Sequence, residues 1–431
     1  MNRGFYTIMA AQFFSSLADN ALLIASIALL IQLDGPAWLT PLLKFFFTVS
    51  YVLLAPFVGA FADSLPKGRV MFLTNSIKIA GCVTMFFYDW LAIPGIAGYW
   101  TVLLAYGLVG LGAAAYSPAK YGILTELLPA RQLVVANGWI EGLTVISIIL
   151  GTVLGGALIS PAVSSTLLSF DMPMVQTGVD SPAEAAILVI AVFYLLAALF
   201  NLYIPDTGAN YGDQHRQPLV LVREFGHCFM TLWRDRLSQI TLAVTTLFWG
   251  AGATLQFIVL KWGEVKLGLP LDKGALLQGV TAIGIAMGSV LAARLIPLKS
   301  SFRVLPLGIA MGLVVICMCV VTWMPLVYVL LIAIGGLAGF FVVPMNAMLQ
   351  HRGHVLMSAG HSIAVQNFNE NLCILIMLGL YAFLISVDVH INWIVLAFGL
   401  FVAGAMLLVK KRHEANQAER DSLHLIGIEK H

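Results

Sequence analysis

Apolar runs of roughly 20 residues recur along almost the whole chain, and they limit its fold more than any other feature of the sequence. A helix of about 20 apolar residues is long enough to cross the hydrocarbon core of a bilayer. The chain has 60% hydrophobic and 10% charged residues, whereas soluble domains carry about 25% charged residues. We therefore expect an all-α integral membrane protein.

Pro, Gly and charged residues divide the apolar runs into twelve predicted transmembrane helices. Their expected limits are 5–33, 40–62, 70–92, 98–117, 135–159, 183–204, 238–262, 274–296, 302–323, 325–349, 359–386 and 390–410. The first run is too long for a signal peptide and lacks a small-residue cleavage site, so we expect it to remain as the first helix.

Basic residues are divided unevenly between the two sides of the membrane. With a cytoplasmic N-terminus, 17 of the 23 Lys and Arg residues fall in cytoplasmic segments, and the outer side keeps only Lys44, Lys261, Lys266 and Lys273. The positive-inside rule then predicts that both termini are cytoplasmic. Among the five cysteines there is no CxxC spacing, which indicates neither a disulfide framework nor a metal site.

Two segments of similar sequence indicate an internal repeat: "GLGAAAYSP" (110–118) and "GLAGFFVVP" (336–344). We predict two pseudo-symmetric six-helix bundles, 1–204 and 238–410, joined by a cytoplasmic linker, 205–237, and followed by a cytoplasmic tail, 411–431. The second half of the linker resembles an amphipathic helix at the membrane surface, anchored by Trp233. In such repeats the substrate binds between the bundles, near the midplane of the membrane.

Asp19 and Asn20 lie near the middle of the first predicted helix. An Asp at this depth costs roughly 2.5–3.5 kcal/mol on insertion scales, and such residues usually mark an ion or substrate path. The Asp19 carboxylate and the Asn20 carboxamide are candidate ligands for Na⁺, and Asp19 alone is a candidate proton site. The alternative is a structural hydrogen bond between helices of the N-terminal bundle.

Two further acids occupy similar places in the two halves. Asn137 and Glu141 share a face of the fifth helix, while Gln366, Asn367 and Glu370 crowd on the eleventh. Facing acids would suit an ammonium headgroup or a coupling cation. The alternative for Glu141, near its helix start, is to complement the helix dipole.

Three basic residues are candidates for binding a phosphate: Lys78, Lys120 and Arg236. Lys78 could instead neutralise a neighbouring acid, and the other two could be ordinary cytoplasmic anchors. Pro118 and Pro344 stand at matched positions of the repeat. They predict either bends near a cytoplasmic gate or the ends of two helices.

The segment "GAFADSLPKGRVM" (59–71) resembles the signature loop between helices two and three of the major facilitator superfamily. The resemblance implies a cytoplasmic latch built from Gly59, Asp63, Lys67, Gly68 and Arg69. Asp63 would accept from a neighbouring helix N-terminus, with Gly68 in the turn, and Lys67 or Arg69 would pair with Glu126. Such a latch would stabilise the outward-open state.

Within this superfamily the chain most resembles the bacterial lysophospholipid transporters, through "ADNALL", "APFVGAFADS", "GAAAYSPAKYGIL", "ANGWIE", "LFWGAG", "GFFVVPMNA" and "IAVQNFNEN". The resemblance implies a secondary transporter of the bacterial inner membrane, working by alternating access. It would flip lysophospholipids such as lysophosphatidylethanolamine from the outer to the inner leaflet, where a partner acyltransferase reacylates them. A coupling cation, Na⁺ or H⁺, is implied; we expect no cofactor and no nucleic-acid partner.

Two other classes of function make different demands on the sequence. An acyltransferase would be expected to carry a His with an Asp five residues later, and none of the nine histidines has one; Walker, zinc and nucleophile-elbow motifs are also missing from the sequence. We therefore do not expect an enzyme. The remaining alternative is a major-facilitator exporter of small amphipathic drugs or metabolites.

Overall fold

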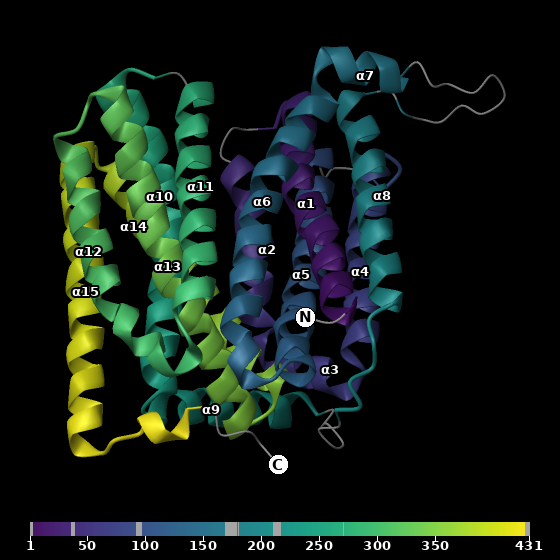
Figure 1. Cartoon of the computed structure of the whole chain (residues 1–431). Helices are drawn as coiled ribbons and strands as arrows, with labels where there is room; N and C mark the ends of the chain where they lie inside the picture. Colours follow the sequence, from purple (N-terminus) through teal and green to yellow (C-terminus); the bar gives the residue numbers. More distant parts are fainter. Residues whose placement is uncertain are drawn as a thin grey trace. The chain divides into compact units, whose positions relative to one another are not determined.

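The fold is almost entirely helical over the residues that the computed structural model describes, which are 3–35, 39–91, 97–168, 179, 181–209, 217–269 and 271–426 (Figure 1). Ten helices in this part of the chain are long and apolar enough to cross a membrane, and a bent helix pair brings the number to eleven. The prediction of an all-α membrane protein is confirmed.

By their internal contacts the residues form two compact units. The first comprises Met1–Lys120 and Ile146–His215. Its elements are α1 (Arg3–Gln32), α2 (Leu39–Leu53), α3 (Ala55–Ser64), α4 (Lys67–Phe86), most of α5 (Gly98–Leu127), the second half of α6 (Leu133–Ile159), α7 (Pro161–Leu168) and α8 (Pro182–Leu202). Helices α1 and α4 both pack against α8, and this packing brings the polar residues of the first unit together.

The second predicted span is a helix pair rather than one straight helix. Helices α2 and α3 meet at Leu54 with an angle of 67° between them. A proline, Pro56, stands in the first turn of α3, where its missing N–H and fixed φ favour a new helix start. Gly59, the first residue of the signature segment, is buried in α3.

Helix α4 corresponds to the predicted transmembrane helix 70–92, but it is not among the helices that are apolar enough to cross a membrane. Its 20 residues are long enough to cross a bilayer. Arg69, Asn75 and Lys78 lower its hydropathy, and two of these side chains are buried inside the protein, Asn75 at 0% and Lys78 at 1% exposure. The polar side chains Asn75 and Lys78 of α4 therefore face the interior of the unit, whereas Leu73 and Val83 are exposed.

The second unit comprises Tyr121–Val145 and Arg216–His431. Besides the end of α5 and the start of α6, its elements are η1 (Ala130–Gln132), α9 (Pro218–Arg234), α10 (Ser238–Leu267), α11 (Leu271–Leu295), η2 (Leu298–Val304), α12 (Leu305–Ile316), η3 (Cys317–Cys319), α13 (Met324–Leu356), α14 (Ala359–Ser386), α15 (Ile391–Glu419) and η4 (Leu423–Leu425). The stretch Tyr121–Val145 thus associates with the C-terminal half of the chain, although it precedes the predicted linker.

Helices α5 and α13 continue through their prolines. Pro118 and Pro344 both lie inside the helices, so the prediction that they end helices four and ten is wrong. Lys120, expected in a break after the fourth span, is likewise part of α5. Helix α15 continues to Glu419, so the first residues of the predicted tail, 411–431, extend this helix.

Helix α9 is the predicted amphipathic helix of the linker, and its apolar face packs onto the second unit. Leu232 forms a buried cluster with Leu242, Leu349 and Val365. Trp233 is half-buried and packs against this cluster, and its role as an interfacial anchor stays a prediction. Residues 210–216 of the linker lie outside the described part of the chain.

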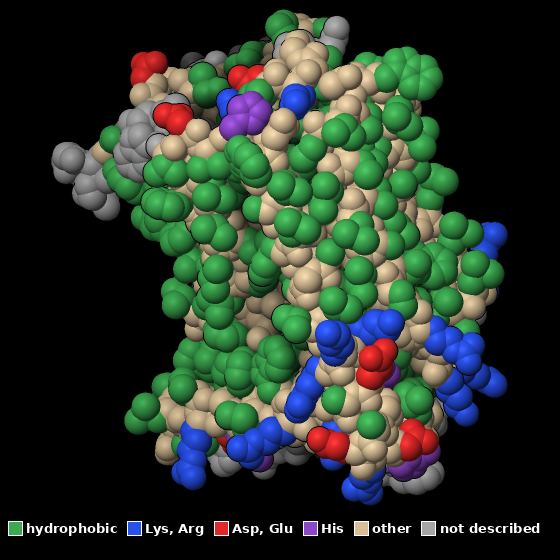
Figure 2. Space-filling view, turned by 90° about the vertical axis from the view of Figure 1, so that its left-hand side faces the viewer, with side chains coloured by type: hydrophobic (Ala, Val, Ile, Leu, Met, Phe, Trp, Pro, Cys, Tyr) green, Lys and Arg blue, Asp and Glu red, His purple; other side chains and the backbone are tan. Residues whose placement is uncertain are grey.

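The outer face formed by α12 and α15 separates apolar from basic side chains. Hydrophobic side chains cover its middle, whereas Lys and Arg side chains gather mostly at its lower end, where α15 ends (Figure 2). Large apolar side chains such as Leu313, Phe401 and Leu408 are more than half exposed. An apolar belt with a basic border is typical of a helix bundle in a lipid bilayer.

Candidate functional site

Asp19 forms an ion pair with Lys78 inside the first unit. The Lys78 Nζ donates to both carboxylate oxygens, at 2.9 Å to Oδ1 and 2.8 Å to Oδ2. The Lys78 side chain is 1% exposed and that of Asp19 is 19% exposed. The carboxylate is therefore the part of this pair that solvent or a ligand can still reach.

Neighbouring side chains hold this ion pair in place from three helices. Tyr194 of α8 donates its hydroxyl to Asp19 Oδ1 at 2.6 Å. Ser15 of α1 accepts from Lys78 Nζ at 3.0 Å and donates to Asn75 Oδ1 of α4 at 2.8 Å. Each charge thus has several partners, as a charge in a low-dielectric interior requires.

The lysine reaches the carboxylate because its surroundings leave room for its stem. A Cβ at Gly112 of α5 would lie 2.8 Å from Lys78 Cγ, so only glycine leaves this space open. The ammonium lies 5.3 Å from the ring centroid of Tyr116 and 5.6 Å from that of Tyr194, within the range of a cation–π interaction. The alternative that Lys78 neutralises an acid is confirmed.

The structure gives Asp19 a partner other than Asn20. Successive residues of a helix are rotated by about 100° from each other. Asn20 accordingly turns to its own helix, and its Nδ2 donates to the Ser16 carbonyl at 2.8 Å. Both carboxylate oxygens bond the Lys78 ammonium. The role of Asp19 and Asn20 as joint Na⁺ ligands stays a prediction.

A second polar cluster lies on α13 and α14 of the second unit. Gln366 Nε2 donates to Glu370 Oε1 at 2.7 Å and to Asn346 Oδ1 at 3.0 Å. Gln366, Asn367 and Glu370 are each at most 6% exposed. Within the described residues, Gln366 Oε1 and Asn367 Nδ2 are buried without a hydrogen-bond partner. Such atoms are available to a ligand or to water.

Asn137 pairs with a residue of the C-terminal half of the sequence. Its amide exchanges hydrogen bonds with that of Gln350 on α13, at 2.8 and 2.9 Å, and both side chains are almost fully buried. This pair joins residues from the two halves of the sequence within one unit. The side chain of Glu141, on the same helix as Asn137, lies outside the described part of the structure.

The signature loop contains a short ion pair. Lys67 Nζ lies 2.6 Å from Asp63 Oδ1, and both side chains are buried. Gly68 lies in the first turn of α4 and not in the preceding turn, and a Cβ there would meet the end of α8 at 3.1 Å. Arg69 is exposed and Glu126 of α5 is half-buried. The predicted pairing of Lys67 or Arg69 with Glu126 stays a prediction.

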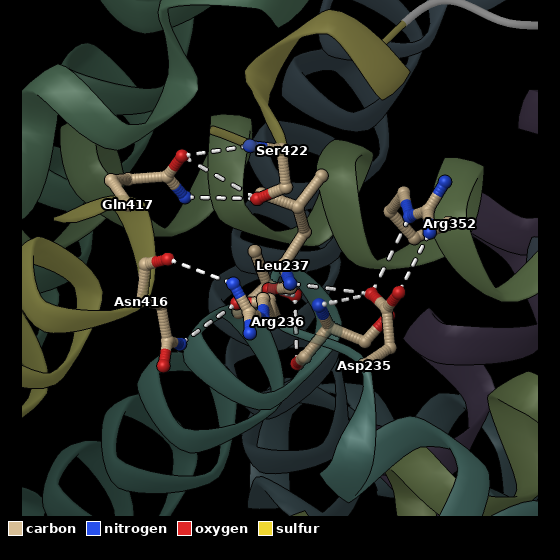
Figure 3. A network of polar contacts seen from close by, with 9 residues as sticks. Asp235, Arg236, Leu237, Arg352, Asn416, Gln417 and Ser422 are labelled. Carbon is tan, nitrogen blue, oxygen red and sulfur yellow. Dashed lines mark hydrogen bonds and ion pairs between the residues drawn. The ribbon is translucent and has the colours of Figure 1, made fainter. Parts of the chain in front are cut away.

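Arg236 lies in the turn between α9 and α10, in a polar network at the end of the second unit (Figure 3). It donates to the Asn416 carbonyl at 3.3 Å and to Glu419 Oε2 at 3.1 Å. Beside it, Asp235 forms an ion pair of 2.7 Å with Arg352 and accepts from the Ser238 N–H at 2.9 Å.

These contacts set the charge of Asp235. Burial alone raises the pKa of a carboxyl group, but the hydrogen bonds from Arg352 and Ser238 outweigh this effect and hold the pKa of Asp235 below its ordinary value of 3.8. Asp235 is therefore ionised at neutral pH and fixes the corner between α9 and α10.

Sequence reasoning missed several of these partners, namely Ser15, Asn75, Tyr194, Gln350, Asp235 and Arg352. The signal for them in the sequence was weak. Ser15, Asn75, Tyr194 and Gln350 are uncharged, and the charged Asp235 and Arg352 lie outside the predicted membrane spans. Charged residues in the middle of a span, such as Asp19 and Lys78, are much rarer and were therefore recognised.

The sequence of the chain matches a known protein family and several named relatives. The model of the Major Facilitator Superfamily matches residues 8–371. The Lysophospholipid transporter LplT of Yersinia enterocolitica is 41% identical over 392 residues, 91% of this chain and 89% of the relative. The LplT of Yersinia pestis (strain Pestoides F) is 42% identical over 387 residues, 90% and 88% of the two chains.

Solved structures agree with the fold. A bacterial homologue of the iron transporter ferroportin in an outward-facing state has a TM-score of 0.71 at 15% identity, over 97% of this chain and 100% of that one. The transporter FucP in the outward conformation gives 0.68 at 15% identity, over 96% and 99%. At this identity the likeness concerns the fold alone. The chain belongs to the major facilitator superfamily and, within it, to the family of the lysophospholipid transporters.

Proposed function

We propose that this protein is a secondary transporter that moves lysophospholipids, such as lysophosphatidylethanolamine, from the outer to the inner leaflet by alternating access. The observation that carries the proposal is the identity of 41–42% with relatives named Lysophospholipid transporter LplT, over about nine-tenths of the chain. The membrane is the bacterial inner membrane, with both termini in the cytoplasm, and a partner acyltransferase consumes the product.

A lysophosphatidylethanolamine headgroup carries an ammonium and a phosphate, and the polar residues of the chain offer both kinds of partner. Glu370, with the open Gln366 Oε1 beside it, suits the ammonium. Glu141 is the second acid proposed for this role. Lys120 and Arg236 remain the proposed phosphate partners, since Lys78 already holds Asp19 at 2.8 Å.

Coupling to Na⁺ or H⁺ acts through Asp19 in this proposal. Its carboxylate is 19% exposed, whereas Lys78 is buried, so a cation reaching the carboxylate would compete with the ammonium for the same oxygens. The competition would change the charge of the first unit during the transport cycle. Replacing Asp19 with Asn removes the negative charge at nearly constant volume.

The coupling test measures transport by wild type and Asp19→Asn in liposomes with and without a Na⁺ or pH gradient. The variant is expected to lose the response to the gradient that drives the wild type. Unchanged gradient dependence would remove Asp19 from this role. Asp206→Asn is the matched control, because it makes the same substitution at an exposed carboxylate outside the helices, and it should keep the response.

The substrate test uses liposomes that carry fluorescent lysophosphatidylethanolamine, the diacyl lipid or a cationic dye. Inward flipping of the lysolipid, with the diacyl lipid left in place, supports the proposal. Movement of the dye without movement of the lysolipid would contradict it. That result would favour an exporter of small amphipathic drugs or metabolites, which the same fold permits.

A further inference from the structure

Two aromatic rings from distant parts of the sequence stack at one end of the second unit. The ring of Phe302, in η2, lies on that of His413, near the end of α15, with centroids 4.4 Å apart and an angle of 13° between the planes. Helices α12 and α15 also pack closely along their length. The stack therefore fixes η2 against the end of α15.

This stack brings basic residues together. Arg303 follows Phe302 and Arg412 precedes His413 in the sequence, and both arginines are exposed. Lys299 and Lys411, also exposed, stand on the same two elements. Neither η2 nor residues 400–413 of α15 contain an Asp or Glu. Like charges gathered in this way repel one another unless an anion binds among them.

The nearest acids along α15 have basic partners of their own. Glu414 lies 3.7 Å from Lys410, and Glu419 lies 3.1 Å from Arg236. Arg412 is oriented by Gln239 of α10, which accepts from its Nε at 3.4 Å. Arg303 adjoins the other ring of the same stack. Guanidinium groups are well suited to a phosphate, which their planar forked donors bind in a bidentate manner.

An apolar stripe leads directly to these arginines. Phe401, Leu408 and Arg412 are spaced by seven and four residues, so they share one face of α15. The exposed fractions of Phe401 and Leu408 are 52% and 69%. On the face shown in Figure 2, hydrophobic side chains lie above and basic side chains below in the same order. Acyl chains along the stripe would place their phosphate at Arg412.

We propose that Arg303 and Arg412, supported by Lys299 and Lys411, bind the phosphate of an anionic phospholipid, whose acyl chains lie along Phe401 and Leu408. The bound molecule is a structural or regulatory lipid of the surrounding leaflet and is separate from the transported substrate. The apolar stripe distinguishes this occupant from a soluble phosphate, which would gain nothing from it. Basic clusters at the cytoplasmic ends of membrane helices commonly bind such headgroups.

The test counts the phosphatidylglycerol and phosphatidylcholine molecules that stay bound to the purified full-length protein in native mass spectrometry. Wild type is expected to prefer phosphatidylglycerol. The double variant R303Q/R412Q is expected to bind it about 25-fold more weakly, from about fivefold for each arginine. The matched control is R223Q/R234Q, which removes two exposed arginines from α9 in the same unit and should keep the preference.

An equal loss of preference in both double variants would overturn the proposal, because the effect would then follow total charge. Unchanged binding by R303Q/R412Q would overturn it as well. Displacement of the lipid by glycerol 3-phosphate at equal concentration would contradict the assigned occupant and indicate a site for soluble anions. Where the double variant does not fold, the single variants R303Q and R412Q take its place, each with an expected fivefold loss.

Discussion

Asp19 and Lys78 show at the scale of single residues how an apolar bundle holds charge. The two charges neutralise each other at 2.8 Å, and loss of one partner leaves the other without compensation in a poorly polarisable interior. Lys78→Met is expected to lower the free energy of unfolding by about 3 kcal/mol. The double variant D19N/K78M should regain part of this loss, as measured by denaturant unfolding in detergent.

The control for this cycle is Lys299→Met, an exposed lysine of η2, which is expected to leave the free energy of unfolding nearly unchanged. If the loss of unfolding free energy in the double variant equalled the sum of the losses in Asp19→Asn and Lys78→Met, Asp19 and Lys78 would not be coupled. The ion pair would then have no part in holding α1 against α4.

The sequence allowed Asp19 and Lys78 to be predicted as important, because a charge in an apolar span is costly wherever its helix packs. Their pairing could not be predicted, since it depends on the rotation of α4 relative to α1. Tyr194 carried even less signal, because an aromatic residue in a membrane helix is ordinary.

At the scale of helices, α11 and α13 approach so closely that only glycine fits between them. A Cβ on Gly288 would clash with the backbone of Gly336. Gly288→Ala is therefore expected to force the helices apart and to lower the free energy of unfolding by about 1–3 kcal/mol. Gly279→Ala on the same helix is the matched control, because a Cβ there meets nothing within 4 Å.

Thermal unfolding of both variants in detergent tests this expectation. The control should be as stable as wild type or slightly more stable, because alanine stabilises a helix by about 1 kcal/mol relative to glycine. Equal melting temperatures for Gly288→Ala and Gly279→Ala would show that the two helices tolerate a wider spacing than the structure has.

Helix positions were predictable from the apolar runs, whereas several helix ends were not. Helices α5, α13 and α15 continue to Leu127, Leu356 and Glu419, beyond the apolar runs from which they were predicted. An apolar run ends where the surroundings become polar, but backbone hydrogen bonds of a helix continue in either environment. A helix end at Pro344 was one of the two alternatives, but α13 continues through this residue. Packed neighbours of a membrane helix can compensate the hydrogen bond that a proline removes.

At the scale of the whole molecule, helix α9 of the predicted linker is part of the second unit. Phe225 and Phe229 of α9 pack on Phe368 of α14, with ring centroids 5.4 and 6.2 Å apart, and Asp235 bonds Arg352 (Figure 3). The amphipathic pattern predicted α9 itself. Its attachment, like that of Tyr121–Val145 to the second unit, involves residues far apart in the sequence.

The Asp235–Arg352 pair makes the stability of this corner depend on pH. The pKa of Asp235 in the folded protein is lowered below 3.8, so the folded state binds a proton more weakly than the unfolded state does. Its contribution to stability is thus present above about pH 4 and is lost as the pH falls through the folded pKa. Asp235→Asn should therefore destabilise the protein at pH 7 and have a smaller effect near pH 3.

Melting temperatures of wild type and Asp235→Asn across this range measure the difference. Arg236→Gln is the contrasting variant: it breaks a pair with Glu419 whose side chains are 35% and 66% exposed, and exposed pairs contribute little. It should leave the melting temperature nearly unchanged at both pH values. An Asp235→Asn variant as stable as wild type at pH 7 would mean that α9 is held by its apolar face alone, with Phe368 and the Leu232 cluster sufficient to fix the linker.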